Sequence, residues 1–373
     1  MYARRSVGLM AFVAFAALLV AGAQPAAAGT SHPSFYGVYY QPQPRQERDI
    51  RAMDQGNIQH ARTAVRWSTV EPRQGSYNWT EYDQRIGDMA AHGIKVLPVL
   101  FGSPHWAEPL GGTSPPLSSD ASRQGWSNFV TAAVNRYGPG GTYWTTSYLV
   151  QHPGKAPKPI TDWQAWNEEN LQHYFATDDR GPVTDADKSR RINAYAELLQ
   201  LTHAAVKRGD SSSSVVLGGL VGNGEPSGSM DAWGFLSRLY HKRGIKNQFE
   251  VAAIHPYATT PHYMKKWLRN YREVMKKHHD GGTPVWVTEI GWGSGHPDKY
   301  GFNLGPQGQK RMLTKALSVL YQRRNKYGLD RAYWFELRDP EHGNPRCSFC
   351  GTSGLLKSNF DKKPAWRAFK RFT

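Results

Sequence analysis

Short apolar runs alternate with amphipathic segments along most of this chain, and that alternation is the feature that most restricts its fold. The runs are rich in β-branched and aromatic residues and are bounded by loop residues, which is typical of buried strands. We expect eight strands: Ser34–Tyr39, Thr63–Trp67, Lys95–Phe101, Thr161–Trp166, Val215–Leu220, Val251–His255, Val285–Glu289 and Ala332–Glu336.

The segments between these runs place apolar residues three and four positions apart, as a helix requires. A helix between consecutive strands implies parallel pairing with crossovers, so the pattern predicts an α/β fold, the (β/α)8 TIM barrel. A doubly wound open sheet is the competing fold, but no G-x-G-x-x-G motif follows the first strand. An insertion is expected at Gly138–Pro159. The main predicted helices are Tyr77–His92, Ser122–Tyr137, Asp185–Arg208, Ser229–Arg243, Pro261–His278 and Pro306–Tyr327.

The composition is that of a globular protein with an unusual charge. The chain has 373 residues, 39% of them hydrophobic, with 13 Trp, 19 Tyr and 14 Phe, which is enough for a large core. Two cysteines exclude a scaffold built from disulfides and a four-cysteine zinc site. The formal net charge of +16 needs an explanation, and nucleic acid, an anionic surface or no partner at all could provide it.

The N-terminus has the three parts of a secretory signal peptide. Arg4 and Arg5 precede the apolar run Val7–Ala23, and Ala26–Ala28 supply the small residues of a cleavage site. A membrane anchor is the alternative, but the run is short for a span. We therefore expect a signal peptide over 1–28, a single catalytic barrel over 29–373, and a secreted, extracellular protein without a stable membrane anchor. Outside the cell, the neighbouring Cys347 and Cys350 are expected to form a disulfide.

Two glutamates end predicted strands on opposite sides of the barrel. Glu168 closes the fourth strand and Glu289 closes the seventh, both in apolar, Trp-rich surroundings where an unpartnered charge is costly. In a parallel barrel the carboxyl ends of all strands meet at one edge, so the two side chains should face each other. Two facing carboxyl groups are the minimal apparatus of glycoside hydrolysis.

Several motifs then resemble clan A of the glycoside hydrolases, which are retaining TIM-barrel enzymes. The strong ones are Trp166-Asn167-Glu168 and the stretch from Thr288 to Trp292, and weaker ones are Val65-Arg66-Trp67, Val216–Leu220 and His255-Pro256-Tyr257. The nearest group by resemblance contains the β-xylosidases, the α-L-iduronidases and bacterial exopolysaccharide hydrolases. The likeness extends over essentially the whole chain after the signal segment.

The resemblance implies a role for each matching residue. Glu168 would be the general acid/base and Glu289 the nucleophile, with their carboxyl groups roughly 5 Å apart. Arg66 and Tyr257 would donate hydrogen bonds to Glu289, and Asn167 would bind the sugar 2-hydroxyl. Glu169 should point away from the site, because adjacent residues diverge.

Other candidates are aromatic or histidine residues at strand ends. Trp334 is expected to be the aromatic platform under the reacting sugar, with a core tryptophan as the alternative. His105, Trp106 and His255 could donate to sugar hydroxyls, or could be packed and satisfied. The further candidates for walls of the sugar site are Trp292, Tyr39, His173 and Tyr174.

Two other glutamates are rival carboxylates of lower rank. Glu71 precedes Pro72 in a loop and is expected to cap or pair, and Glu336 ends the eighth strand without a preceding Asn. No H-E-x-x-H motif is present, and the 14 His are mostly scattered, so no metal and no cofactor are expected.

Together these features predict a secreted retaining glycoside hydrolase, monomeric, that cleaves O-glycosidic bonds of an oligosaccharide or polysaccharide. The alternative is a catalytically weak or inactive carbohydrate-binding barrel of the cell envelope. A nucleic-acid partner is not expected, because no such motif accompanies the charge. Much of the basic excess falls on predicted outer helices. We expect it to hold the protein near an anionic cell-envelope polymer, and a solvated basic surface without a partner is the alternative.

Overall fold

All strands that the structure describes belong to one sheet in which every paired neighbour is parallel, in the order β5-β4-β3-β2-β1-β9-β8-β7-β6. The computed structural model describes residues 31–42, 46–177, 184–223, 229–344 and 347–373. The strands are β1 Tyr36–Tyr39, β2 His60–Arg66, β3 Lys95–Phe101, β4 Asp162–Ala165, β5 Ser214–Val216, β6 Leu220–Val221, β7 Ala252–His255, β8 Val285–Ile290 and β9 Leu329–Trp334.

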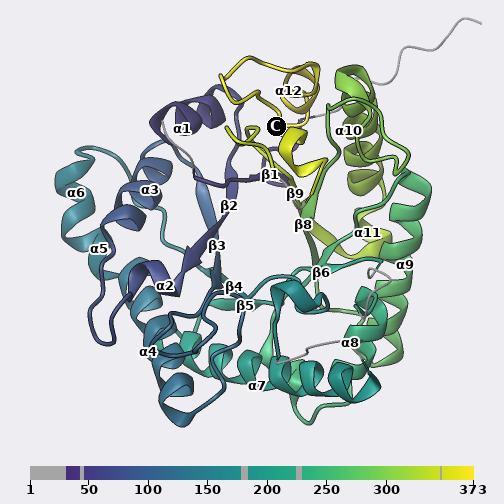
Figure 1. The fold of residues 1–373 in the computed structure, drawn as a ribbon. Coiled ribbons are helices and arrows are strands. Elements are labelled where there is room, and N and C mark those ends of the chain that lie inside the picture. Colours follow the sequence, from purple (N-terminus) through teal and green to yellow (C-terminus); the bar gives the residue numbers. More distant parts are fainter. Residues whose placement is uncertain (1–30, 43–45, 178–183, 224–228, 345–346) are drawn as a thin grey trace, which may run out of the picture.

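The two ends of this sheet meet, so the strands ring a common axis (Figure 1). The Val251 carbonyl oxygen, next to β7, accepts a hydrogen bond of 2.8 Å from the Leu217 amide, which directly follows β5. Val216 and Val251 also form a parallel bridge. The predicted TIM barrel is therefore confirmed.

The predicted fifth strand is the one that differs, because it is divided into β5 and β6. Between these two pieces lie Gly218 and Gly219, and other side chains occupy the space that a larger residue would need. A Cβ atom on Gly218 would lie 1.8 Å from a carboxylate oxygen of Glu169, and one on Gly219 would lie 1.9 Å from His255 Nε2. The glycine pair thus lets two polar side chains pack against the backbone of this strand.

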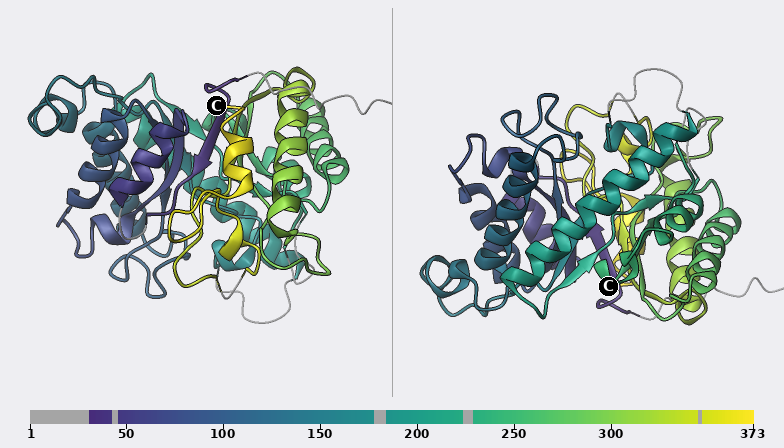
Figure 2. Two further views of the ribbon diagram at one scale, coloured as in Figure 1. Left: turned by 90° about the horizontal axis from the view of Figure 1, so that it is seen from above. Right: turned by 90° about the horizontal axis from the view of Figure 1, so that it is seen from below.

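Helices surround the strands, as Figures 1 and 2 show. Several begin at a side-chain cap, such as Ser119 before α4, Thr260 before α9, and the capping box of Thr184 and Asp187 at α7. The helices are α1 Gln46–Gln55, α2 Trp67–Val70, α3 Thr80–Ala91, α4 Asp120–Tyr137, α5 Thr142–Thr145, α6 Ser147–Gln151, α7 Asp185–Gly209, α8 Ala232–Tyr240, α9 Pro261–Lys277, α10 Gly305–Gln322, α11 Arg324–Tyr327 and α12 Pro364–Phe369, with short 3-10 helices at η1 Gln172–Tyr174, η2 Ile245–Gln248 and η3 Cys350–Thr352.

The expected insertion at Gly138–Pro159 contains α5 and α6 and packs on the outside of the barrel. The Tyr143 hydroxyl donates to the carbonyl oxygen of Asp83 in α3, at 2.7 Å. The segment connects a helix to the strand that follows it, so it enters the barrel at the amino ends of the strands, away from Glu168 and Glu289.

The two cysteines form the expected disulfide. Cys347 and Cys350 are bonded, with their Cα atoms 5.3 Å apart. The predicted signal peptide lies outside the described residues. Among the described residues, no helix is both long enough and apolar enough to cross a membrane.

Candidate active site

The structure brings the two predicted catalytic glutamates together. Glu168 follows β4, and Glu289 is the last residue but one of β8. Their exposed fractions are 6% and 7%. One carboxylate oxygen of each, together with a ring nitrogen of His255, lies within 4.8 Å of the others. This is the close spacing found in retaining glycosidases, and an inverting pair would need about 6.5 Å or more.

The backbone around Glu168 is held in an unusual conformation. Trp166 and Glu168 have φ angles of 72° and 55°, a region that residues other than glycine rarely adopt. Trp166 is fully buried, and its indole nitrogen donates a hydrogen bond of 2.8 Å to the Tyr174 carbonyl oxygen. Such conformations persist only where surrounding contacts fix them, and they cluster at functional sites. Here packing of Trp166 fixes the turn that presents Glu168.

Glu289 receives two hydrogen bonds. Arg62 Nη1 donates to one carboxylate oxygen at 2.5 Å, and the Tyr257 hydroxyl donates to the other at 2.8 Å. Burial raises the pKa of the Glu289 carboxyl above its ordinary value, and the Arg62 charge and these hydrogen bonds oppose this rise. Both donors favour the ionised form, which is the form a nucleophile needs.

The arginine that binds Glu289 is Arg62, and the prediction of Arg66 was wrong. Both point to the same side of β2 because strand residues alternate, but Arg62 lies four residues deeper in the barrel. Its guanidinium is fully buried and also donates to Gln164, at 2.7 Å, and to Asn167, at 2.8 Å. Arg66 is exposed at the end of β2, where its guanidinium lies 5.4 Å from the centre of the Phe101 ring.

His255 lies next to Glu168, the other glutamate of the pair. Its Nδ1 is 2.8 Å from an Oε1 atom of Glu168 and 3.7 Å from Glu289. Burial and the Arg62 charge hold the pKa of His255 well below its usual value, so the ring is neutral. Its Nε2 has no hydrogen-bond partner. Because a buried N–H without an acceptor is rare, we assign the ring proton to Nδ1, which then donates to Glu168.

This placement changes the expected role of the histidine. His255 was predicted to donate to sugar hydroxyls, but its Nδ1 is engaged by Glu168 and its Nε2 packs against Gly219. Tyr257, in contrast, lies where it was predicted, on Glu289.

Glu169 turns away from the pair, as expected for the neighbour of Glu168. It is fully buried, and neither of its carboxyl oxygens has a hydrogen-bond partner. Burial raises the pKa of this carboxyl well above the ordinary value. Glu169 is therefore a neutral acid packed against Gly218.

Two predicted sugar-binding tryptophans are instead core residues. Trp334 and Trp292 are both fully buried, and their ring centres are 6.1 Å apart. The indole nitrogen of Trp334 donates to Ser353, and that of Trp292 donates to Ala258. Both predictions as surfaces for a sugar were wrong, because neither ring is accessible to a ligand.

The aromatic side chains beside Glu289 are Phe335, Tyr39 and Tyr257. Phe335 directly follows β9, is partly exposed, and stacks on Tyr39 with ring centres 5.1 Å apart. Tyr257 contacts it edge to face at 6.3 Å. Phe335, and not Trp334, is therefore the partly exposed aromatic residue at this strand end. The sequence could have indicated Phe335, because it is the neighbour of Trp334 in the eighth predicted strand, Ala332–Glu336.

Three further predicted sugar-binding residues are Asn167 and, in the loop after β3, His105 and Trp106. The Asn167 side-chain oxygen accepts from Arg62, which leaves its amide N–H groups for a ligand. Trp106 is partly exposed and donates to the Glu71 carbonyl oxygen at 2.9 Å. His105 is exposed, with Nδ1 3.1 Å from the Pro109 carbonyl oxygen. These contacts satisfy Trp106 and one nitrogen of His105 within the protein, and sugar contact by either residue stays a prediction.

The two rival carboxylates, Glu71 and Glu336, are both buried in the fold. Glu71 accepts hydrogen bonds from the Trp67 indole, at 2.6 Å, and from the Gly75 amide, at 2.7 Å. Glu336 is buried, and burial, with the charges of Asp339 and Glu289, raises the pKa of its carboxyl well above the ordinary value. Glu336 is therefore a neutral neighbour of Glu289.

Glu168, His255 and Glu289 are also the cluster of described residues whose spacing could hold a metal ion. The Arg62 guanidinium already supplies a positive charge 2.5 Å from Glu289, and a second cation there would be repelled. The arrangement fits acid–base and nucleophilic chemistry better than metal binding.

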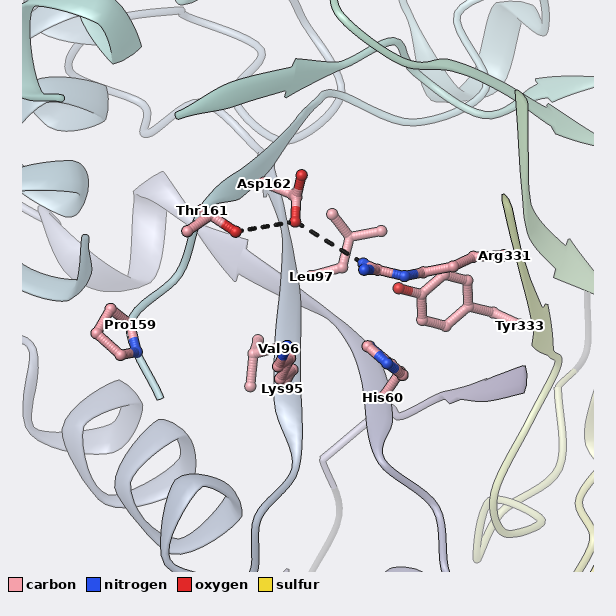
Figure 3. Close-up of a pocket in the computed structure, with 9 residues that line it drawn as sticks. All are labelled: His60, Lys95, Val96, Leu97, Pro159, Thr161, Asp162, Arg331 and Tyr333. Atoms are coloured by element: carbon pink, nitrogen blue, oxygen red, sulfur yellow. Dashed lines mark hydrogen bonds and ion pairs between the residues drawn. The ribbon is translucent and has the colours of Figure 1, made fainter. Parts of the chain in front are cut away.

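The opposite end of the barrel holds a small cavity of about 20 Å³, with room for a water molecule (Figure 3). Arg331 and Asp162 form an ion pair of 3.8 Å beside it, and His60 and Lys95 also line it. Burial and the charges of Arg331 and Lys95 lower the pKa of His60 to about 3. This end contains no pair of facing carboxylates among its lining residues.

Comparison with known proteins agrees with this geometry. A family model of the glycoside hydrolase family 42 β-galactosidases matches residues 39–112, which is less than half of the chain. A search of curated protein sequences finds no match. Solved structures of glycosidases do resemble the chain, at low sequence identity.

Three of these structures illustrate the likeness. A family 39 glycoside hydrolase from Bacteroides cellulosilyticus WH2 has a TM-score of 0.65 and 23% identity over 91% of this chain and 63% of its own. A monomeric β-xylosidase from Caulobacter crescentus CB15 has a TM-score of 0.62 and 19% identity, over 92% and 68%. An exo-β-1,4-mannosidase from Opitutaceae bacterium strain TAV5 has a TM-score of 0.61 and 14% identity, over 90% and 58%.

These neighbours include a family 39 glycoside hydrolase and a β-xylosidase, in agreement with the predicted resemblance to the β-xylosidase group of clan A. At such identities what is shared is the fold. The chain spans about 63% of the length of the Bacteroides protein, so the activity and substrates of these larger proteins do not transfer directly.

Proposed function

We propose that this protein is a retaining glycoside hydrolase that cleaves O-glycosidic bonds in an oligosaccharide or polysaccharide. The observation that carries the proposal is the pair of carboxyl groups within 4.8 Å at the carboxyl end of the barrel, each with its own hydrogen-bonding partners. The glycosidase fold of the structural neighbours adds independent support.

The chemistry would follow from the two environments. Glu289, whose ionised form is favoured by the donors Arg62 and Tyr257, attacks the anomeric carbon while Glu168 gives its proton to the leaving oxygen. This forms a glycosyl ester on Glu289. Glu168, now a carboxylate, then takes a proton from water, and that water cleaves the ester with net retention of configuration.

Neighbouring residues would position the sugar. The Asn167 amide N–H groups are free to donate to the 2-hydroxyl, because the Asn167 oxygen is held by Arg62. The partly exposed rings of Phe335 and Tyr39 offer apolar surface to the C–H face of a sugar. Both kinds of contact are made next to Glu289, where the reaction takes place.

We further propose that the protein is secreted and acts as a monomer. The basis is the signal-like N-terminal segment and the close-spaced disulfide of Cys347 and Cys350, together with the monomeric Caulobacter β-xylosidase among the neighbours. On the likeness to that β-xylosidase, we propose a β-xyloside as the substrate class of this protein.

A matched pair of variants tests the proposal. The protein is screened against aryl β-glycosides and a polysaccharide panel, and Glu168→Gln is compared with Glu169→Gln. We expect the first change to abolish most turnover, because it removes the acid, and the second to leave it nearly intact. Equal activity of Glu168→Gln and the unchanged protein on the true substrate would contradict the assignment, as would a panel without any hydrolysis.

A further inference from the structure

An aromatic patch lies on the outside of the barrel, between α8 and α9. Trp233 is near the start of α8, and Tyr263 and Trp267 occupy the first two turns of α9. The ring centres of Trp233 and Trp267 are 5.1 Å apart, and those of Trp267 and Tyr263 are 5.9 Å apart. Both pairs have an interplanar angle of 25°, so the three rings form one nearly parallel row.

The row is open to solvent. Tyr263 is 45% exposed and is one of few large hydrophobic side chains exposed to this extent among the described residues. Trp233 and Trp267 are partly exposed. Gly222, directly after β6, makes room for the row, because a Cβ atom there would lie 3.0 Å from the Trp267 ring. Stacked rings that stay open to water are suited to an apolar ligand face.

Basic residues lie on the same helix as two of these rings. The Lys266 ammonium is 5.6 Å from the centre of the Trp267 ring, and Arg269 is exposed one turn further along α9. Asp231, near Trp233, accepts a hydrogen bond from the Gly234 amide as the cap of α8. The acid on α9, Glu273, pairs with Lys276 at 3.3 Å. The basic residues of α9 are Lys265, Lys266, Arg269, Arg272, Lys276 and Lys277.

We propose that Trp233, Tyr263 and Trp267, with Lys266 and Arg269, form a binding platform for an acidic polysaccharide, separate from the catalytic pair. The rings would contact the C–H faces of sugar rings, and the two cations would pair with carboxylate groups on the same chain. Neither feature alone selects this ligand, but a uronic-acid polymer has both an apolar ring face and a negative charge on each sugar.

The platform lies near the edge of the barrel at which the strands have their carboxyl ends. Both helices begin where a preceding strand ends, at the same edge that carries Glu168 and Glu289. A polysaccharide held there would be kept near the catalytic edge. The protein would then act on an acidic polymer, or on another glycan that accompanies one.

The test measures binding of the whole protein to immobilised polygalacturonate, with highly methyl-esterified polygalacturonate as the uncharged match. We expect binding to the acidic form that weakens as salt rises. Tyr263→Ala should weaken it about fivefold to tenfold, because one exposed ring is removed. Lys266→Gln with Arg269→Gln should weaken it by at least about as much.

The control is an equal loss of charge elsewhere. Arg323→Gln with Lys326→Gln removes two exposed cations beyond α10 and should change binding by less than about twofold. Equal weakening by both double variants, unchanged binding by Tyr263→Ala, or equal binding of the esterified polymer would each overturn the platform. Turnover of a small aryl glycoside should be unaffected by Tyr263→Ala, so failure of this test is distinct from failure of the proposed hydrolysis.

Discussion

The two ends of the barrel arrange charged and acidic side chains in opposite ways. At the carboxyl end, carboxylate oxygens of Glu168 and Glu289 lie within 4.8 Å of each other. Trp166 and Glu168 there adopt strained, positive φ angles. At the amino end, Asp162 and Arg331 have opposite charges and pair, and the Arg331 guanidinium also lies 4.4 Å from the centre of the Trp286 ring.

This difference indicates what each end is for. Two carboxyl groups close together, with strain in the backbone, destabilise the fold and are retained only where chemistry needs them. An ion pair that covers a small cavity contributes to closure and stability. Substitutions of similar residues at the two ends should therefore have different consequences.

The largest difference is expected between Arg62→Lys and Arg331→Lys. A lysine keeps the charge of Arg62 but cannot donate to Glu289, Gln164 and Asn167 at once, so kcat/KM should fall by about a hundredfold or more. Arg331→Lys at the amino end should leave kcat/KM within about twofold. Steady-state kinetics on the same aryl glycoside measures both, and an equal loss in the two variants would refute the contrast.

The two buried histidines give the next contrast. His255→Asn removes the N–H that we assign to Glu168, so kcat should fall about tenfold to a hundredfold. Without that donor the pKa of Glu168 should rise, and the basic limb of the pH–rate profile should move to higher pH. His60→Asn should change neither quantity. A fall in kcat for His255→Asn without movement of the basic limb would indicate a purely structural role.

The smallest effects concern stability, and they should have opposite signs. The folded pKa of Glu169 lies above its unfolded value, so its contribution to stability is full below about pH 4.5 and is lost as the pH rises through the folded pKa. Glu169→Gln should therefore stabilise the fold by about 1 kcal/mol or more at pH 8 and by less at pH 4. Asp162→Asn should destabilise it by less than about 1 kcal/mol.

Urea unfolding of both variants at the two pH values checks these expectations. Glu169→Gln that destabilises the protein equally at pH 4 and pH 8 would show that its carboxyl has a partner that matters. A loss of several kcal/mol in Asp162→Asn would show that the amino end is held more strongly than a partly exposed ion pair allows.

The barrel and the two glutamates could be predicted from the sequence because both depend on local patterns. Strand and helix periodicity placed Lys95–Phe101 as β3 without error, and the motif around Asn167 located Glu168 at the edge of the barrel. The interruption between β5 and β6 was missed, because it depends on Glu169, which follows β4, and on His255 in β7, and both pack against the glycines.

The errors within the site have one physical cause, which is depth. The sequence indicates that a residue ends a strand, but not how far into the barrel a long side chain is held. Arg66 was therefore chosen over Arg62, although a charged residue inside an apolar strand already signals a buried partner. For the same reason Trp334 was chosen over Phe335, one residue further on, where the side chain is partly exposed.

The configuration of the first product tests the central claim most directly. An aryl glycoside that the protein hydrolyses is followed by proton NMR, and the anomeric proton of the released sugar is observed before mutarotation. We predict the same anomeric configuration as in the substrate, because carboxyl groups this close act through a glycosyl ester on Glu289. Release of the inverted sugar would contradict the account.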